Sequence, residues 1–217
     1  MTLKTRLLGL TSVLTVAATI FTASPAMAAT IETGHLDVFD VDYNAANNTL
    51  TLDLRTYEPD NDDLSPAGTV LRVVPAATAT IPSGTAWQCL GPAGTSMYVA
   101  PQTLVSDRLY AGWNTTDVPA AQGPVKLELT GWSGPPGSRF ALYTTAGFPA
   151  TPSFKLNTNP ATGCPVSVWP GGIASGTHAH GNWAFSTAGT YTLTFRATAL
   201  NGAGATSGAV TYTFQAG

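Results

Sequence analysis

Charge is scarce in this sequence, and positive charge is scarcer than negative charge. The chain has 9 Lys and Arg residues against 12 Asp and Glu residues, a formal net charge of −3. Proteins that bind nucleic acid carry clustered positive charge, so this acidic composition excludes nucleic acid as a partner. Oppositely charged pairs at i and i+4, which are typical of surface helices, are missing, and Gly, Pro, Thr and Ser recur every few residues. We therefore expect few helices.

Long apolar runs are also lacking, apart from one near the start of the chain. This run covers residues 7–21, follows Lys4 and Arg6, and leads into a small-residue segment that ends at Ala28. The pattern predicts a signal peptide over residues 1–28 and therefore a secreted protein. No later stretch has the roughly 20 apolar residues of a membrane-spanning helix, so the mature protein is not expected to span a membrane.

Residues 29–217 are predicted to form a single domain, because their number lies within the ~100–200 residues typical of one domain. Apolar and polar residues alternate over short segments, for example at Leu50, Leu52 and Leu54, and turn residues separate these segments. The expected strands are residues 34–43, 49–57, 70–74, 97–100, 108–113, 125–130, 139–144, 190–199 and 209–215. Residues 44–48 are expected to turn the first two strands into a hairpin, and residues 148–175 to form a long connection.

This pattern predicts an all-β fold, an antiparallel immunoglobulin-like β-sandwich with long loops. Tyr191 begins the penultimate expected strand. Its position there fits either a tyrosine corner of an immunoglobulin-like sandwich or an ordinary core aromatic residue.

Cysteine is limited to two residues, Cys89 and Cys164. In an exported protein such a pair is expected to form a disulfide, because the compartment is oxidising. The alternative is that the two thiolates bind a metal ion, although thiolate ligands usually occur in close C-x-x-C pairs.

Histidine is limited to three residues, His35, His178 and His180. In an extended strand, His178 and His180 lie on one face about 7 Å apart along the backbone, an arrangement suited to a shared metal ion. His35 is then the third candidate ligand, and Asp37, on the same face of its strand, is either the fourth ligand or an acceptor that orients an imidazole. The competing interpretation is that the histidines only hydrogen-bond to loop backbone.

Several motifs resemble those of one family. The motifs are residues 34–38, 90–91, 99–102, 110–113, 177–185 and 189–191. They are similar, and in the same order, to those of the actinobacterial surface-anchored protein domain found in choice-of-anchor M proteins, which accompany metal-type ABC transporters.

The resemblance implies an extracellular domain that receives a divalent metal ion or metal complex and passes it to the substrate-binding protein of an ABC transporter. We expect Zn²⁺, with Cu or Mn as alternatives. Asn182, Trp183 and Trp113 are expected to lie around the site as second-shell or rim residues. No sortase motif or membrane anchor is seen at the end of the sequence, so a secreted or wall-associated form is expected.

Two other functional classes remain open at this stage. Trp87, Trp113, Trp132, Trp169 and Trp183 could form a platform for a cell-wall carbohydrate or adhesion ligand, provided that at least two are exposed and coplanar. A metal-dependent hydrolase would need a general base near the histidines, and the sequence offers Glu32 only if it approaches His35 in space. A non-catalytic binding protein is therefore expected.

Nine of the twelve acidic residues lie between Glu32 and Asp63. Asp40 and Asp42 begin a segment like a calcium-binding loop, but Ala45 occupies the position of the required Gly and Thr51 that of the bidentate Glu. A calcium loop of this type is therefore not expected, and a looser carboxylate site for a hard cation is the remaining alternative.

Overall fold

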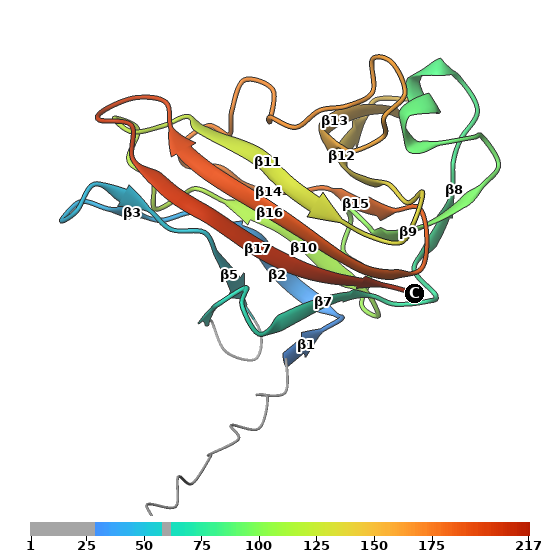
Figure 1. Ribbon diagram of the computed structural model, residues 1–217, viewed down its shortest axis with the longest axis horizontal. Coiled ribbons are helices and arrows are strands. Elements are labelled where there is room, and N and C mark those ends of the chain that lie inside the picture. Colours follow the sequence, from blue (N-terminus) through green and yellow to red (C-terminus); the bar gives the residue numbers. More distant parts are fainter. Residues whose placement is uncertain (1–28, 58–61) are drawn as a thin grey trace, which may run out of the picture.

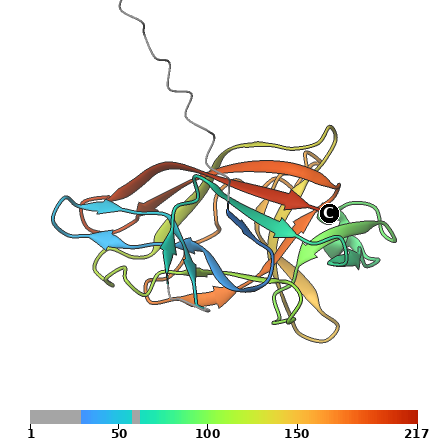
Figure 2. The same cartoon turned by 90° about the horizontal axis from the view of Figure 1, so that it is seen from below.

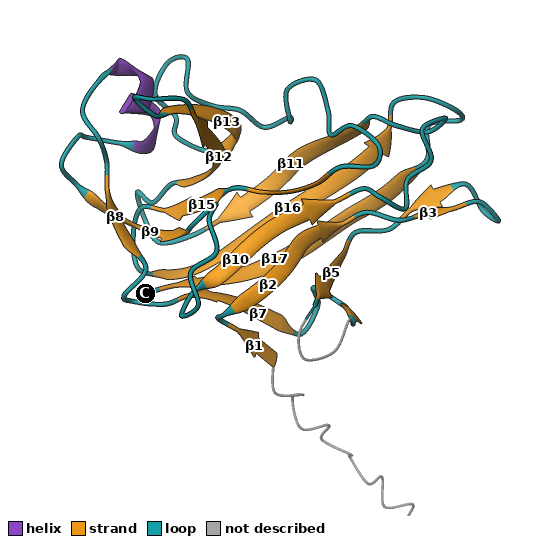
Figure 3. Ribbon diagram, turned by 180° about the vertical axis from the view of Figure 1, so that it is seen from behind, coloured by secondary structure: helices purple, strands orange, loops and turns teal. Residues whose placement is uncertain are grey.

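The computed structural model describes residues 29–57 and 62–217, and strands dominate this part of the chain (Figures 1 and 3). The predicted signal peptide, residues 1–28, lies outside the described residues. Within them, the single helical element is a short 3-10 helix, η1 (Thr85–Leu90), so the predicted all-β fold class is confirmed. No helix of the described part has the length and apolar character needed to cross a membrane.

The described strands form three five-stranded sheets and one hairpin. Sheet 1 has the order β1 (Ala29–Ile31), β7 (Thr69–Val73), β17 (Thr206–Ala216), β16 (Gly189–Ala199), β11 (Val125–Ser133). Sheet 2 has the order β14 (His178–His180), β10 (Leu109–Asn114), β2 (Gly34–Asp40), β5 (Asp53–Thr56), β6 (Asp63–Leu64). Sheet 3 has the order β13 (Thr151–Asn157), β12 (Phe140–Ala146), β15 (Asn182–Phe185), β9 (Ser96–Ala100), β8 (Thr78–Thr80). The hairpin pairs β3 (Tyr43–Asn44) with β4 (Thr49–Leu50).

Sheet 1 forms one layer of a β-sandwich, and sheet 2 faces it across the core (Figure 2). Phe39 on β2 meets Phe195 and Tyr212 of sheet 1, with ring centroids 4.8 and 5.7 Å apart. Trp183 on β15 of sheet 3 stacks on Phe214 of sheet 1 at 5.5 Å. The apolar residues that alternate along β16 and β17 therefore face the opposing layer, as the two-residue period of a strand requires.

Most strand pairs are antiparallel, as predicted, but β1 with β7, β7 with β17, and β2 with β10 are parallel. The Tyr191 hydroxyl donates to Thr187 O at 2.9 Å and accepts from the Thr187 N–H at 3.2 Å. A bond of this kind at the start of a strand is characteristic of a tyrosine corner. The immunoglobulin-like strand topology itself stays a prediction.

Two expected segments differ in detail from the structure. The predicted hairpin around residues 44–48 is present, with β2 and β5 paired antiparallel, but the pairing is interrupted before the turn, where β3 and β4 form a separate short pair. Residues 148–175 are not an uninterrupted connection, because they contain β13 (Thr151–Asn157). β13 is the edge strand of sheet 3, where Pro152 is tolerated because its missing N–H does not have to join a ladder.

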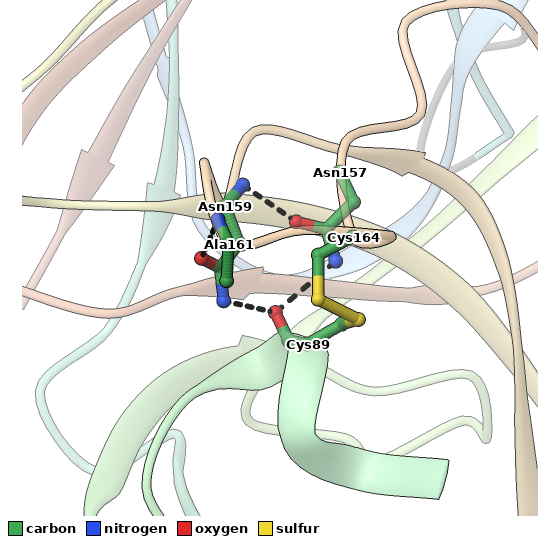
Figure 4. Close-up of a disulfide and its surroundings, with 5 residues drawn as sticks. All are labelled: Cys89, Asn157, Asn159, Ala161 and Cys164. Atoms are coloured by element: carbon green, nitrogen blue, oxygen red, sulfur yellow. Dashed lines mark hydrogen bonds between the residues drawn. A yellow bond between two sulfur atoms is a disulfide. The ribbon is translucent and has the colours of Figure 1, made fainter.

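The predicted disulfide between Cys89 and Cys164 is present, and no described cysteine is free to act as a thiolate ligand. It ties η1 to the segment that follows β13 (Figure 4). The Asn157 and Asn159 amides both donate to Cys89 O, at 3.2 and 3.0 Å, and the Ala161 N–H donates to Asn159 Oδ1 at 3.0 Å. The cross-link and these bonds together hold the two segments in one arrangement.

Candidate metal centre

Three neighbouring strands of sheet 2 bring the histidines together. β10 lies between β14 and β2, so His178 and His180 approach it from one side and His35 and Asp37 from the other. The register pairs Gly112 of β10 with both His180 and Asp37. Residues in register on neighbouring strands point to the same face, and so do residues two apart on one strand. The four side chains therefore share one face of sheet 2.

Gly112 leaves the space in which these side chains meet. A Cβ atom at position 112 would lie 2.7 Å from Asp37 Oδ1, 2.7 Å from His180 Cδ2 and 2.7 Å from Ala179 O. A side chain at position 112 would therefore force these atoms to move, and the Ala179 carbonyl belongs to the backbone, so glycine keeps this space open. Because the middle strand contributes no side chain here, side chains from the two outer strands can converge above it.

The distances between the side chains are those of a metal site. His35 Nε2 lies 3.2 Å from His178 Nε2 and 3.7 Å from Asp37 Oδ1, and His178 Nε2 lies 3.2 Å from Asp37 Oδ2. One ligand atom from each of His35, Asp37, His178 and His180 lies within 4.8 Å of the others. Ligand atoms around a tetrahedral Zn²⁺ at bond lengths of about 2.1 Å are roughly 3.4 Å apart. The group can therefore hold a metal ion with small adjustments.

The electrostatics of the cluster also suit a cation. Asp37 Oδ1 and His180 Nε2 are buried and have no hydrogen-bond partner among the described residues. Burial raises the pKa of the Asp37 carboxyl, against the opposing effects of the Tyr57 hydrogen bond, His178 and His35. Burial, together with His35 and His178, lowers the pKa of His180 to about 4. His180 is therefore neutral at pH 7, and neutral imidazole is the form that binds metal ions.

Two tyrosines support the cluster, and neither was singled out from the sequence. The Tyr57 hydroxyl donates to Asp37 Oδ2 at 2.7 Å, and its ring stacks on His35 with centroids 4.1 Å apart. Tyr110 stacks on His180 with centroids 3.7 Å apart. A hairpin that turns around Ala46 places Tyr57 opposite His35. The contact between Tyr57 and His35 could therefore have been predicted from the expected hairpin.

Comparison of the chain with family models, with curated proteins and with solved structures gave no match. A function for this protein therefore has to be inferred from the side chains that the fold brings together.

The three residues expected at the rim serve the framework instead. Trp113 and Trp183 belong to the hydrophobic core, 4% and 0% exposed. Trp113 is in register with Ala179, which lies between the two histidines, so its side chain points to the face opposite the histidines. The Trp183 Nε1–H donates to Ala111 O and so supports β10 from the core side. Asn182 accepts from the Gln102 N–H at 3.0 Å and fastens β15 to the segment after β9.

The alternative of a tryptophan platform is not supported by the structure. Trp113, Trp169 and Trp183 are buried, Trp87 is half-buried, and Trp132 is exposed to 41%. Carbohydrate binding by two coplanar exposed indoles is therefore excluded.

Acidic residues gather at the far end of β2, around Arg55 of β5. Arg55 Nη1 lies 3.7 Å from Asp40 Oδ2 and 3.6 Å from Asp117 Oδ2. The Asp40 side chain is 1% exposed, and burial, followed by the charge of Asp42, raises the pKa of its carboxyl to about 7 despite Arg55. Among the described residues, ligand atoms converge for a metal ion only in the histidine cluster. The alternative of a looser carboxylate site for a hard cation, which included Asp60, Asp62 and Asp63, finds no support among the described residues, and Asp60 lies outside them.

The Asp40→Asn variant is expected to be more stable than wild type above pH 7 and equally stable near pH 4. Between pH 3.8 and about 7, the folded state keeps a proton on Asp40 that the unfolded state has lost. The wild type therefore loses stability as the pH rises through this window, whereas asparagine has no charge to bury. The difference in free energy of unfolding should reach about 1–3 kcal/mol.

Urea unfolding at pH 4, 5.5 and 8 measures this difference. Asp107→Asn, which removes an exposed carboxylate, is the matched control and should change stability by less than about 0.5 kcal/mol. A difference between Asp40→Asn and wild type that did not change with pH would contradict the burial of a charge.

The Gly112→Ala variant is expected to disrupt the cluster. The new methyl group has to displace Asp37, His180 or the β14 backbone, at a cost of about 1–3 kcal/mol in stability. Zn²⁺ affinity should fall with it, by at least about tenfold, because the ligands are moved. The control is Gly131→Ala, where the nearest atom to the new Cβ lies 3.9 Å away. Calorimetric titration with Zn²⁺ and thermal melting measure both effects; equal behaviour of the two variants would show that Gly112 makes no room for the cluster.

The Tyr57→Phe variant is expected to bind Zn²⁺ about 10–100-fold more weakly, because the ring stays on His35 while Asp37 loses the donor that orients it. Tyr110→Phe is the matched control, since its ring remains stacked on His180. Competition against a chromophoric chelator measures both affinities. An equal loss in the two variants would indicate a general effect of the hydroxyl groups rather than orientation of Asp37.

Proposed function

We propose that this protein is a secreted binding protein for a divalent transition metal, held by His35, Asp37, His178 and His180. The observation that carries the proposal is the convergence of four ligand atoms within 4.8 Å on one face of sheet 2. Three imidazoles and one carboxylate suit Zn²⁺ best. Copper also accepts imidazole ligands, whereas Mn²⁺ prefers more carboxylates, so Zn²⁺ is the preferred ion.

A binding role is favoured over catalysis by the number of protein ligands. Four protein ligands complete a tetrahedral shell, whereas catalytic zinc sites keep one position for water. Glu32, the candidate general base, is engaged with Arg72, whose Nη1 lies 3.0 Å from Glu32 Oε2. We therefore propose that the site binds and releases an ion without hydrolysing a substrate.

We further propose that the protein passes its metal ion, or a metal complex, to the substrate-binding protein of a surface ABC uptake system. The resemblance of the histidine motifs to the surface-anchored family is one reason. The other is exposure, since the side chains of His35 and His178 are 26% and 36% exposed. An ion bound there is reachable by a second ligand, as exchange between proteins requires.

The metal content of protein purified from a culture medium, together with calorimetric titration of the chelator-treated protein, tests metal binding. We expect one Zn²⁺ per chain and a melting temperature that rises when Zn²⁺ is added back. No heat of binding and an unchanged melting temperature at micromolar Zn²⁺ would refute the proposal. For the relay, the loaded protein should give up its ion to 4-(2-pyridylazo)resorcinol without unfolding; release only on denaturation would indicate a structural ion.

A further inference from the structure

A second candidate site lies between the end of β11 and the start of β12. A cavity of about 730 Å³ is lined there by residues that include Trp132, Ser138, Arg139, Thr158, Asn159 and Ala161. This volume falls within the ~300–1,000 Å³ that small-ligand sites occupy. None of these residues belongs to the metal centre.

Trp132 gives the cavity an aromatic wall. It is the exposed member of the five tryptophans, 41% accessible, on β11 at the edge of sheet 1. An indole face left in solvent offers flat apolar surface together with an N–H donor. The C–H face of a sugar ring packs on such a surface, while its hydroxyl groups remain hydrated or bind nearby polar groups.

Arg139 lines the same cavity and carries a positive charge that has no counter-ion among the described residues. Its side chain is half-buried, and no described carboxylate forms an ion pair with it, although the protein is acidic overall. The guanidinium packs against Gly91, where a Cβ atom would lie 2.8 Å from Nη2. A partly desolvated cation held in one place is stabilised by an anionic group, and guanidinium binds carboxylates and phosphates in a bidentate manner.

Another part of the cavity lining is held in place by hydrogen bonds and by the disulfide. Asn159 is 7% exposed, and its amide bonds Cys89 O on one side and the Ala161 N–H on the other (Figure 4). The Cys89–Cys164 disulfide secures the same segment to η1, which precedes the Gly91 that supports Arg139. A preformed wall lowers the entropy that a ligand has to lose on binding.

We propose that this cavity binds an anionic carbohydrate, a sugar ring that carries a carboxylate or a phosphate. The ring packs on Trp132, and the anionic group binds Arg139. Neutral sugars lack the second contact, and simple anions lack the first. The site functions independently of the metal centre, so both can be tested on one protein.

Titration of the full mature chain, followed by the Trp132 indole N–H signal in NMR spectra, tests the proposal. The probes are glucuronic acid and glucose 6-phosphate, which separate a carboxylate source from a phosphate source, with glucose and inorganic phosphate as controls. We expect at least one anionic sugar to bind at least about tenfold more tightly than either control, because a charge-assisted contact adds to ring packing. Three results would each overturn the proposal: an equal affinity for glucose, an equal affinity for inorganic phosphate, or no saturable shift at roughly 50 mM ligand, which is the weak end of specific binding.

Variants assign the two contacts separately. Arg139→Gln should lower the affinity for the anionic sugar by at least about tenfold, whereas Arg196→Gln, which removes an exposed charge on β16, should leave it unchanged. Trp132→Ala should weaken binding by at least about tenfold, and the folded state should tolerate this change because the side chain is exposed. Arg139→Lys keeps the positive charge and replaces Arg139→Gln in this test if Arg139→Gln has a lowered melting temperature. Equal losses in the Arg139 and Arg196 variants would show attraction by net charge alone and would refute the site.

Discussion

The His180→Ala variant is expected to bind Zn²⁺ at least about 100-fold more weakly than the wild-type protein, the largest effect of any single change in this chain. Loss of a partner that only orients a ligand already costs about 10–100-fold in affinity, and loss of the ligand itself costs more. His180 has a buried Nε2 without a hydrogen-bond partner among the described residues, and a metal ion would give this nitrogen a partner. His178→Ala should have a similar effect, since His178 Nε2 lies 3.2 Å from both His35 Nε2 and Asp37 Oδ2.

Thermal melting with and without Zn²⁺ measures this loss in a second way. At a Zn²⁺ concentration 100 times the dissociation constant, binding stabilises the folded state by about 2.7 kcal/mol. For a domain of this size, that corresponds to roughly 5–11 °C in melting temperature. The wild type should show the shift, and His180→Ala should not.

Asp107→Ala, an exposed residue in the loop before β10, is the control and should keep the full shift. Because all three histidines of the sequence lie in the cluster, no control histidine exists elsewhere in the chain. If His180→Ala retained wild-type affinity and the full thermal shift, the metal would bind elsewhere and the assignment of the site would be wrong.

The Cys89→Ser/Cys164→Ser double variant is expected to lose about 4 kcal/mol of stability. The disulfide closes a loop with a sequence separation of 75 residues, and the chain-entropy estimate for such a loop is about 4 kcal/mol. The melting temperature should therefore fall by roughly 8–16 °C, measured by calorimetry of the oxidised protein and the double variant.

The same variant separates the two proposed sites. Zn²⁺ affinity should stay within about threefold of wild type, because the metal ligands lie on β2 and β14, and the disulfide joins η1 to the segment after β13. Binding of the anionic sugar should weaken, because the Asn159 wall loses its covalent attachment. A large loss of Zn²⁺ affinity would show that the cross-link organises the whole sandwich rather than one end of it.

Much of the fold follows from local sequence patterns. β16 and β17 were expected from the alternation of apolar residues such as Leu193, Phe195 and Phe214, all 0% exposed in the structure. Alternation of apolar and polar residues indicates that one face of a strand is buried. This pattern can be recognised from residues that are close together in the sequence. β13 was missed because an edge strand with Pro152 has weak alternation and several half-exposed residues. Patterns that depend on burial lose their signal where burial is partial.

The sequence predicted which residues form the candidate site, but it did not predict how the fold holds them together. Scarcity of histidine singled out His35, His178 and His180, and strand periodicity added Asp37. The support from Tyr57 required the hairpin register, and that of Tyr110 required the pairing of β10 with β2 and β14. Trp113 and Trp183 were expected as second-shell or rim residues; both indoles are buried in the core, so neither lies at the rim, and the second-shell role stays a prediction.

The sequence by itself determined the all-β class, the disulfide pair and the identity of four side chains that can hold a metal ion. Each follows from composition or from a short-range period. Only the tertiary structure decided that these side chains meet, because His35 and His178 are separated by 143 positions and are joined through a third strand. It also showed that a glycine at position 112 leaves the space between them, and that Trp132 and Arg139 line one cavity. The order of strands distant in sequence and the register between them arise from packing of the whole chain, whereas the register of a hairpin such as β2 and β5 is set locally by its turn.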